Sequence, residues 1–150
     1  MKKQLFTVML IIAAGAITMP SCKKSSSSTT TTTPTTTTTA VFKATVNGTV
    51  ETWGTYYYQL LSGGTYISAF TGTQQKVQLV VTNAQVAGTY TIGTLVMANY
   101  WDASNTMHSA TTGTITISSI ANNTITGTFA FVESGGVTVT NGVFTSIPKQ

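Results

Sequence analysis

Residues 124–132 (TITGTFAFV) decide the fold of this 150-residue chain. Residues 125, 127, 129 and 131 (Ile, Gly, Phe, Phe) alternate with polar or small ones, and this period of two is typical of a strand with one buried face. Asn122-Asn123 precedes the stretch and Gly135-Gly136 follows it. Both pairs are typical of tight turns. The stretch therefore predicts an antiparallel strand between two turns.

Similar short runs, separated by turn residues, extend in both directions from this strand. Residues 137–147 close the domain, with Asn141-Gly142 as a bulge or turn, and Asn47-Gly48 is typical of a type I′ hairpin turn. The other predicted extended runs are 42–46, 49–58, 65–71, 76–82, 88–92, 95–101 and 113–119. About eight to ten strands at this spacing predict an all-β domain over 40–150, an antiparallel meander forming a β-sandwich or a flattened β-barrel.

The N-terminus has the pattern of a secretion signal. Lys2 and Lys3 precede an apolar run over residues 5–17, which is too short to span a membrane. Ser21 then precedes Cys22, as in the lipobox of bacterial lipoprotein precursors, although Met19 and Pro20 depart from its commonest residues. We therefore expect a signal peptide over 1–21 and lipidation of Cys22. The alternative is an ordinary cleaved signal with an incidental cysteine.

Residues 22–39 form the predicted lipid anchor and a Ser/Thr-rich linker with one proline, Pro34. This segment has no hydrophobic side chain to bury, which predicts a spacer without packed structure. A glycosylated stalk is the alternative. Lys23 follows the cysteine where an Asp would suggest inner-membrane retention, so the outer membrane is favoured. Which side of that membrane the domain faces stays open.

Few charges remain once the signal and anchor are set aside. Charged residues make up 7% of the chain, against about 25% in ordinary soluble proteins. From residue 40 onward three lysines balance three acidic residues. A neutral domain lacks the basic surface that binds phosphate backbones, so nucleic acid is excluded as a partner.

The residues available for acid–base chemistry are equally few. Asp102 and His108 could join one of the serines in a hydrolase triad, and Glu51 and Glu133 could form a glycosidase pair. Neither set lies in a recognisable catalytic motif. The sequence therefore predicts a protein that is not an enzyme.

Metal and cofactor sites find equally little support. Asp102, Ser104 and Asn105 could contribute to a calcium site, but they offer one carboxylate, and an Asx-turn explains them more simply. We expect no metal and no cofactor.

Aromatic residues give the better indication of a binding site. In a regular strand Trp53 and Tyr57 would share one face with Glu51 below them, and Tyr100-Trp101 form a second cluster. Flat rings beside amides and hydroxyls can stack on sugar rings while their neighbours bind hydroxyls. Trp53, Tyr57, Tyr100 and Trp101 are therefore the candidate ligand-binding residues. Filling of the core by the same rings is the alternative.

Several segments taken together resemble a family of small envelope lipoprotein domains of unknown function that is common in bacteroidetes. The resemblance covers nearly all of residues 40–148. It is carried by residues 42–48 (FKATVNG), Trp53, and residues 88–90 (GTY), 113–117 (GTITI), 127–131 (GTFAF) and 140–144 (TNGVF). The resemblance implies an all-β envelope lipoprotein and assigns no functional residue.

The sequence thus predicts a non-catalytic binding or interaction module tethered to the outer membrane by its lipid. The expected ligand is a glycan, a peptide or an envelope protein. The alternative is a structural envelope component that associates with itself, because few charges protect the strand edges.

Overall fold

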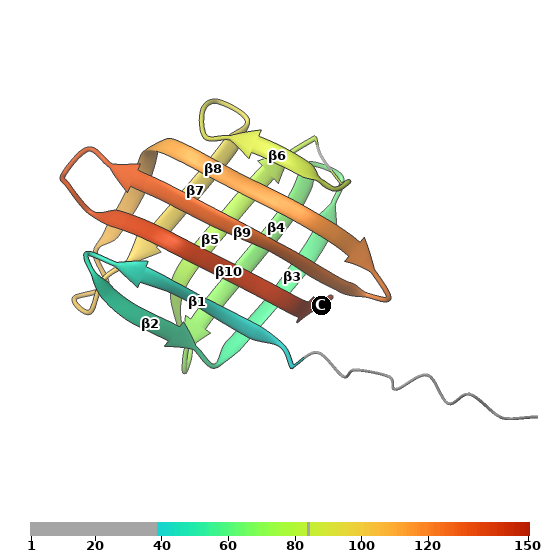
Figure 1. The fold of residues 1–150 in the computed structure, drawn as a ribbon, viewed down its shortest axis with the longest axis horizontal. Helices are drawn as coiled ribbons and strands as arrows, with labels where there is room; N and C mark the ends of the chain where they lie inside the picture. Colours follow the sequence, from blue (N-terminus) through green and yellow to red (C-terminus); the bar gives the residue numbers. More distant parts are fainter. Residues whose placement is uncertain (1–38, 84) are drawn as a thin grey trace, which may run out of the picture. The chain divides into compact units, whose positions relative to one another are not determined.

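The computed structural model describes residues 39–83 and 85–150. Ten strands and no helix make up this part of the chain, as Figure 1 shows. The strands are β1 (Val41–Val46), β2 (Thr49–Trp53), β3 (Thr55–Leu61), β4 (Gly64–Thr71), β5 (Gln74–Thr82), β6 (Gly88–Thr91), β7 (Val96–Trp101), β8 (Met107–Ala121), β9 (Thr124–Glu133) and β10 (Thr138–Pro148). The predicted signal peptide, Cys22 and nearly all of the linker lie outside the described residues.

The strands form two layers that share one long strand. Sheet A has the order β2-β1-β10-β9-β8-β6, and sheet B has the order β3-β4-β5-β7-β8. The 15-residue strand β8 pairs with β7 at its start and with β6 and β9 further along. The strands of the two layers cross one another in Figure 1. All strand pairs are antiparallel, which confirms the predicted sandwich or flattened barrel.

The predicted turns follow from residues that accept positive φ. Asn47 and Gly48 have φ of 47° and 84°, and Asn122 and Asn123 have φ of 51° and 57°. Asparagine and glycine adopt this region at the lowest cost, and type I′ hairpins require it at both central positions. Asn141, with φ of 50°, lies at the predicted bulge, where the register of β10 against β9 shifts.

Two glycines in sheet A allow phenylalanine rings to cover the backbone of the neighbouring strand. A Cβ on Gly127 would lie 2.0 Å from the carbonyl oxygen of Thr116 and 2.4 Å from the Phe144 ring. A Cβ on Gly142 would lie 2.6 Å from the Phe129 ring. Such glycine–aromatic pairs, together with bulges, let a sheet curve toward closure.

The core lies between the two sheets and is centred on Phe42. Its ring lies 5.5 Å from Trp53, 5.6 Å from Phe129 and 6.1 Å from Phe144, centroid to centroid. All four side chains are almost fully buried. This aromatic cluster explains how a chain with few charges and many threonines excludes water from its interior.

Both ends of the described domain are attached to strand β3. The Tyr56 hydroxyl donates to the carbonyl oxygen of Ala40 at 2.8 Å. The backbone N–H of Gln150 donates to the carbonyl oxygen of Tyr58 at 2.9 Å, beside a parallel bridge between Tyr58 and Lys149. These contacts partly close the gap between β10 and β3.

The prediction of one continuous strand over 49–58 is wrong. Gly54 separates β2, which belongs to sheet A, from β3, which belongs to sheet B. The chain changes sheet at this residue, so side-chain alternation is not continuous across it. The predicted run over 113–119 is also too short, because β8 begins at Met107 and bends through both sheets.

The described part of the chain contains no helix with the length and hydrophobicity needed to cross a bilayer.

Candidate functional site

The four aromatic residues singled out in the sequence divide between the core and the surface. Trp53 is 2% exposed and Tyr100 is 6% exposed, and both belong to the core. Tyr57 and Trp101 are half-buried and lie on the outer face of sheet B. The prediction that Trp53 and Tyr57 share a face is therefore wrong, because Gly54 places them in different sheets.

Two further aromatic residues that the sequence analysis did not single out, Tyr66 and Phe70 on β4, lie on the same outer face. They alternate with the buried Ile67 and Ala69, so the period of two within β4 was the signal that could have found them. Tyr57 stacks on Phe70 with ring centroids 5.4 Å apart and planes inclined by 24°. We call the outer face of sheet B, with Tyr57, Tyr66, Phe70 and Trp101, the aromatic face.

A row of polar side chains crosses the middle of the aromatic face. Its members come from β4, β5, β7 and β8 and lie opposite one another in the strand register. Tyr57 on β3 lies at the end of this row, opposite its β4 member. We call it the amide row, and it consists of Ser68, Gln78, Asn99 and Ser109.

Larger and mostly apolar side chains lie on both sides of the amide row. Phe70, Trp101 and Met107 lie on one side, while Tyr66, Val80 and Met97 lie on the other. The aromatic face thus has a polar row in its middle and, on either side of it, large side chains that are mostly apolar but include Gln59 and Gln75.

The aromatic face carries almost no charge. Lys76 is the one charged residue in the described strands β3, β4, β5 and β7. It is 9% exposed, and its Nζ donates to the carbonyl oxygen of Asp102 at 2.8 Å. The lysine is therefore held at the end of the sheet and does not project toward a ligand on the face.

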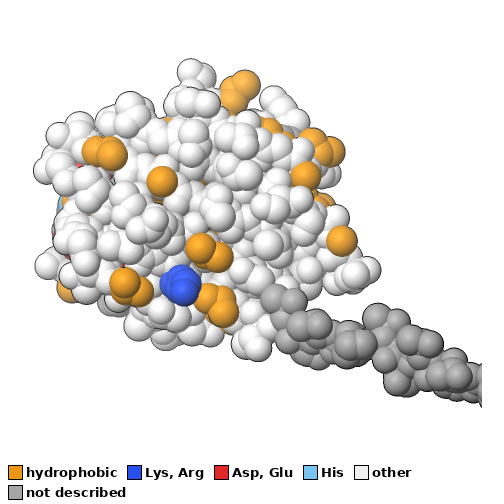
Figure 2. Space-filling model, viewed as in Figure 1, with side chains coloured by type: hydrophobic (Ala, Val, Ile, Leu, Met, Phe, Trp, Pro, Cys, Tyr) orange, Lys and Arg blue, Asp and Glu red, His pale blue; other side chains and the backbone are white. Residues whose placement is uncertain are grey.

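The outer face of sheet A has a different composition. Threonines on adjacent strands face outward in register, as in the row Thr89, Thr116 and Thr128. Figure 2 shows this side of the molecule as mostly uncharged polar surface with scattered hydrophobic atoms. None of the described aromatic side chains points outward from sheet A.

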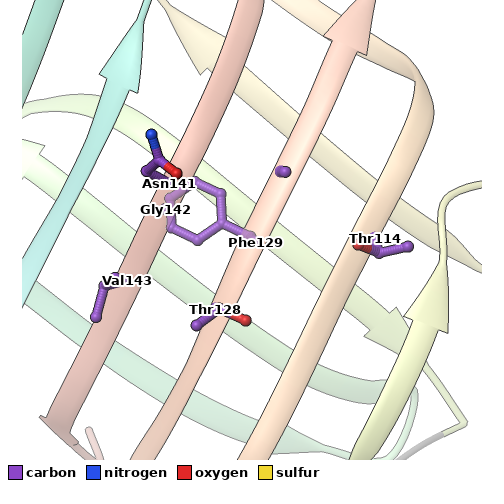
Figure 3. A pocket seen from close by; sticks show the side chains of 7 residues that line it. Thr114, Thr128, Phe129, Asn141, Gly142 and Val143 are labelled. Carbon is purple, nitrogen blue, oxygen red and sulfur yellow. The ribbon is translucent and has the colours of Figure 1, made fainter.

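A shallow depression of about 390 Å³ interrupts the outer face of sheet A over strands β8–β10 (Figure 3). It forms where the bulge at Asn141-Gly142 leaves no side chain over the Phe129 ring. Thr114, Thr128 and Val143 surround it. The depression is a consequence of the bulge and is open to solvent.

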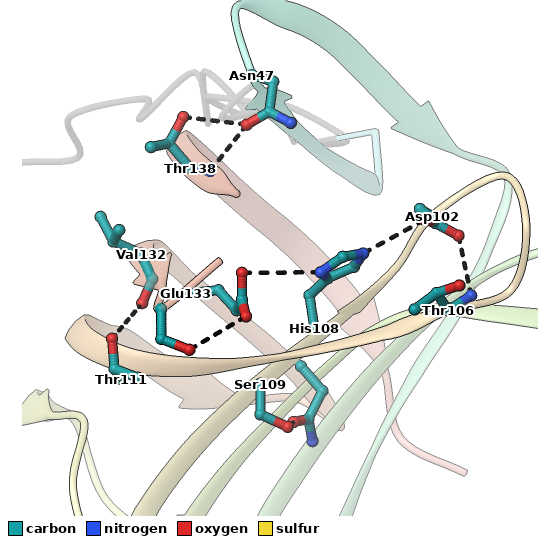
Figure 4. A network of polar contacts seen from close by, with 11 residues as sticks. Asn47, Asp102, Thr106, His108, Ser109, Thr111, Val132, Glu133 and Thr138 are labelled. Carbon is teal, nitrogen blue, oxygen red and sulfur yellow. Dashed lines mark hydrogen bonds and ion pairs between the residues drawn. The ribbon is translucent and has the colours of Figure 1, made fainter. Parts of the chain in front are cut away.

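Three of the domain's four acidic and imidazole side chains meet at one end of the barrel (Figure 4). His108 Nε2 lies 3.3 Å from Asp102 Oδ2, and its Nδ1 lies 3.8 Å from Glu133 Oε2. The His108 ring also stacks on Tyr100, whose hydroxyl donates to Glu51 Oε1 at 2.9 Å. We call Glu51, Asp102, His108 and Glu133 the ionisable cluster.

Local hydrogen bonds lower the pKa of two carboxyl groups of this cluster, those of Asp102 and Glu133. The backbone N–H of Thr106, 2.9 Å from Asp102 Oδ1, and then His108 lower the pKa of Asp102. The backbone N–H of Gly135, together with Val137 and Ser134, lowers the pKa of Glu133. Burial and the hydrogen bond to Glu51 raise the pKa of Tyr100. The carboxyl groups of Asp102 and Glu133 are therefore ionised at neutral pH.

The arrangement of the ionisable cluster differs from that of a hydrolase triad. Asp102 and His108 are within hydrogen-bond reach, but the second nitrogen of His108 faces Glu133 instead of a hydroxyl. The hydroxyls of Ser109 and Ser134 donate to Asn99 and to Glu133. Acyl transfer needs a nucleophile beside the base, and the described residues place none there.

The alternatives that involve Glu51, Glu133 and the 102–105 loop have local structural explanations. Glu51 accepts from Tyr100, whereas Glu133 accepts from its own turn. Asp102 accepts from the backbone N–H groups of Thr106 and Ser104 in the β7–β8 turn, and the contact with Ser104 is the one that the Asx-turn alternative expects. In residues 39–83 and 85–150 no group of three or more His, Cys, Asp or Glu side chains is arranged to hold a metal ion.

Fold and surface together define a small all-β sandwich with a neutral aromatic face. Residues 38–148 match the family described as domain of unknown function DUF6252, and the chain belongs to this family. No curated protein and no solved structure matches the chain. The prediction of a domain of unknown function over nearly all of residues 40–148 is confirmed, and the envelope-lipoprotein part stays a prediction.

Proposed function

We propose that this protein is a non-catalytic binding module and that its aromatic face is the ligand-binding surface. One observation carries the proposal: every outward-pointing aromatic ring of the described strands lies on sheet B and none on sheet A. Rings left in contact with water forgo part of the free energy of burial. Their concentration on one face is expected of a surface that a ligand covers.

Membrane attachment through a lipid on Cys22, in the outer membrane, is the second part of the proposal. It rests on the signal-like residues 1–21 and on the position of the chain's single cysteine directly after them. Two or three acyl chains hold a protein stably at a membrane, whereas one holds it marginally. A module anchored in this way would meet ligands at the cell envelope.

Self-association as a structural envelope component is the alternative function. It is favoured by Met97 and Met107, which are about half exposed on the aromatic face, and by the edge strand β2. This strand exposes 68% of Val50 and has no lysine or proline to block pairing with another edge. The alternative predicts dimers or larger species that grow with protein concentration.

The binding part is tested by the fluorescence of Trp101. The chain has two tryptophans, so Trp53→Phe leaves Trp101 as the sole source of tryptophan emission. The full chain in detergent micelles is titrated with polysaccharides, peptides and purified envelope proteins. We expect a saturable emission change with one class of ligand, which Tyr57→Ala weakens and the sheet A control Thr116→Ala leaves unchanged. Emission that responds to none of the classes contradicts the proposal.

The anchoring part is tested separately. We expect the mature protein to begin at a lipid-modified Cys22 and Cys22→Ser to move it out of the membrane fraction. Mass spectrometry that finds an unmodified Cys22 thiol in protein from cells rules out the lipid anchor.

A further inference from the structure

We infer that the ligand of the aromatic face is a neutral, linear polysaccharide whose chain crosses the strands of sheet B along the amide row. The inference rests on the proposed function, since it specifies the ligand of the same face. It is carried by the order of polar and apolar rows, by unpaired amide groups and by the absence of projecting charge.

The order of the rows argues against a protein partner. Protein interfaces have an apolar centre and a polar rim. Here Gln78 and Asn99 lie in the middle, and the accessible apolar residues Met97 and Trp101 lie at the sides. A polar centre suits a ligand that has hydrogen-bonding groups along its whole length.

The amide row has unused hydrogen-bonding capacity. Within the described residues the Gln78 side chain makes no hydrogen bond, and Asn99 uses only its Oδ1, which accepts from Ser109 at 2.8 Å. The Gln78 amide and the Asn99 NH₂ group therefore offer three or more donor and acceptor positions to a ligand. Sugar hydroxyls can both donate to and accept from such amides.

The rings beside the amide row supply the second element of sugar recognition. Tyr57 and Phe70 form a nearly parallel pair at the β3–β4 side, and Trp101 lies two strands away on β7. The C–H faces of pyranose rings are apolar and pack on flat aromatic rings. Rings at one end of the amide row and along one side of it suit a ligand that presents both apolar faces and hydroxyls.

The distribution of charge on the aromatic face favours a polysaccharide without charged groups. Lys76 is committed to the Asp102 carbonyl, and no other cation belongs to β3, β4, β5 or β7. Asp102 and Glu133 lie beside His108 at the end of the barrel, where Asp102 Oδ2 is 3.3 Å from Nε2 and Glu133 Oε2 is 3.8 Å from Nδ1. Polysaccharides with carboxylate or sulfate groups would therefore lose hydration without gaining an ion pair on this face.

The length of the amide row sets a size requirement. The row crosses four strands from Ser68 to Ser109, and Tyr57 extends the line to a fifth, a span of roughly 19 Å at about 4.8 Å per strand. This span accommodates several sugar rings in an extended chain. Short oligosaccharides would fill only part of the row, so affinity should rise with chain length and then level off.

The test uses the full-length Trp53→Phe protein in detergent micelles. Soluble xylan, mannan, starch and mixed-linkage β-glucan serve as neutral probes, and polygalacturonate serves as the acidic probe. We expect saturable binding of at least one neutral polymer, with at least tenfold weaker binding of polygalacturonate. Fragments of the bound polymer that contain two sugars should bind at least tenfold more weakly than fragments of six.

Variants locate the ligand on the face. Gln78→Ala and Trp101→Ala should each weaken binding about tenfold, whereas the outward sheet A variants Thr116→Ala and Thr128→Ala should leave it unchanged. Binding by Trp101→Ala is measured by calorimetry because this variant removes the fluorescent reporter. Unchanged circular dichroism spectra show that the variants are folded.

The outcomes separate this inference from the proposed function. If Trp101 responds to a protein or peptide and to none of the neutral polymers, the face binds a ligand but the polysaccharide assignment is wrong. Binding of a neutral polymer that Gln78→Ala and Trp101→Ala do not alter also overturns the assignment. If Trp101 responds to no ligand of any class, both proposals fail.

Discussion

The outer faces of the two sheets come from one chain of uniform composition but differ in what they present to solvent. Sheet A presents threonines in register across several strands, while sheet B presents four aromatic rings around a row of amides. The inner sides of both sheets contribute buried residues to one hydrophobic core. Burial in the core accounts for the apolar inner residues of both sheets, and contact with solvent accounts for the threonines outside sheet A, but neither accounts for the rings outside sheet B.

The largest difference in stability should be between substitutions of two adjacent tyrosines. Tyr58 is 1% exposed in the core, whereas Tyr57 points outward. We expect Tyr58→Ala to lower the free energy of unfolding by about 3–5 kcal/mol, as for other buried aromatic residues. Tyr57→Ala should cost about 1 kcal/mol, mainly the contact with Phe70. Urea unfolding curves provide the measurement, and equal losses would show that the two faces are not energetically distinct.

The next effect tests how sheet A is packed on its inner side. Gly127→Ala would bring a methyl group against the Thr116 carbonyl and the Phe144 ring. We expect a loss of about 1–3 kcal/mol from overpacking. The matched control is Thr128→Ala, the outward neighbour on the same strand, which should change stability by less than about 0.5 kcal/mol. Thermal unfolding of the two variants gives the comparison, and a neutral Gly127→Ala would exclude the close approach.

A smaller loss of stability should appear at acidic pH. It arises at the end of the barrel where the β7–β8 and β9–β10 turns lie. The pKa values of Asp102 and Glu133 are lower in the folded protein than their ordinary values of 3.8 and 4.5. The unfolded chain therefore binds more protons as the pH falls. This contribution to stability is complete above about pH 5 and is lost as the pH falls below the ordinary values toward the folded ones.

Melting temperatures between pH 3 and pH 6 check this expectation. The wild-type curve should fall below about pH 4.5, and the curve of the Asp102→Asn/Glu133→Gln variant should be flatter over the same range. Parallel curves for the two proteins would mean that these carboxylates do not stabilise the folded state.

The smallest effect is expected on the outer face of sheet A. Thr89 Oγ1 and Thr116 Oγ1 lie 3.1 Å apart on the exposed surface. Thr116→Val removes this hydrogen bond but keeps the β-branched shape, so stability should change by less than about 0.5 kcal/mol. A loss above 1 kcal/mol in urea unfolding would show that the threonine rows contribute to the fold instead of only covering it.

The sequence was sufficient for the fold class because the relevant signals are local. Alternation over residues 124–132 and the Asn-Gly pair at 47–48 depend only on neighbouring residues. The change of sheet at Gly54 depends on pairing between distant strands, and no local signal distinguishes it from a continuous strand. The length of β8 was missed for the same reason, because its first residues pair with β7 and its later residues with β9.

The site could be predicted only in part. Tyr57 and Trp101 were found because aromatic residues with polar neighbours are conspicuous, whereas Trp53 and Tyr100 could not be assigned to the core without knowing which side of each strand is covered. Trp53 is buried because β2 pairs with β1 beside Phe42. His108 contacts Glu133 because β8 pairs with β9. The residues next to either one in the sequence do not reveal this pairing.

Strand β3 holds both Ala40, through the Tyr56 side chain, and Gln150, through the Tyr58 backbone. The two attachment points are two residues apart, or roughly 7 Å along the strand. A short peptide could therefore join residue 150 to residue 40, and the chain could be reopened at an exposed turn such as 72–73 without rearranging either sheet.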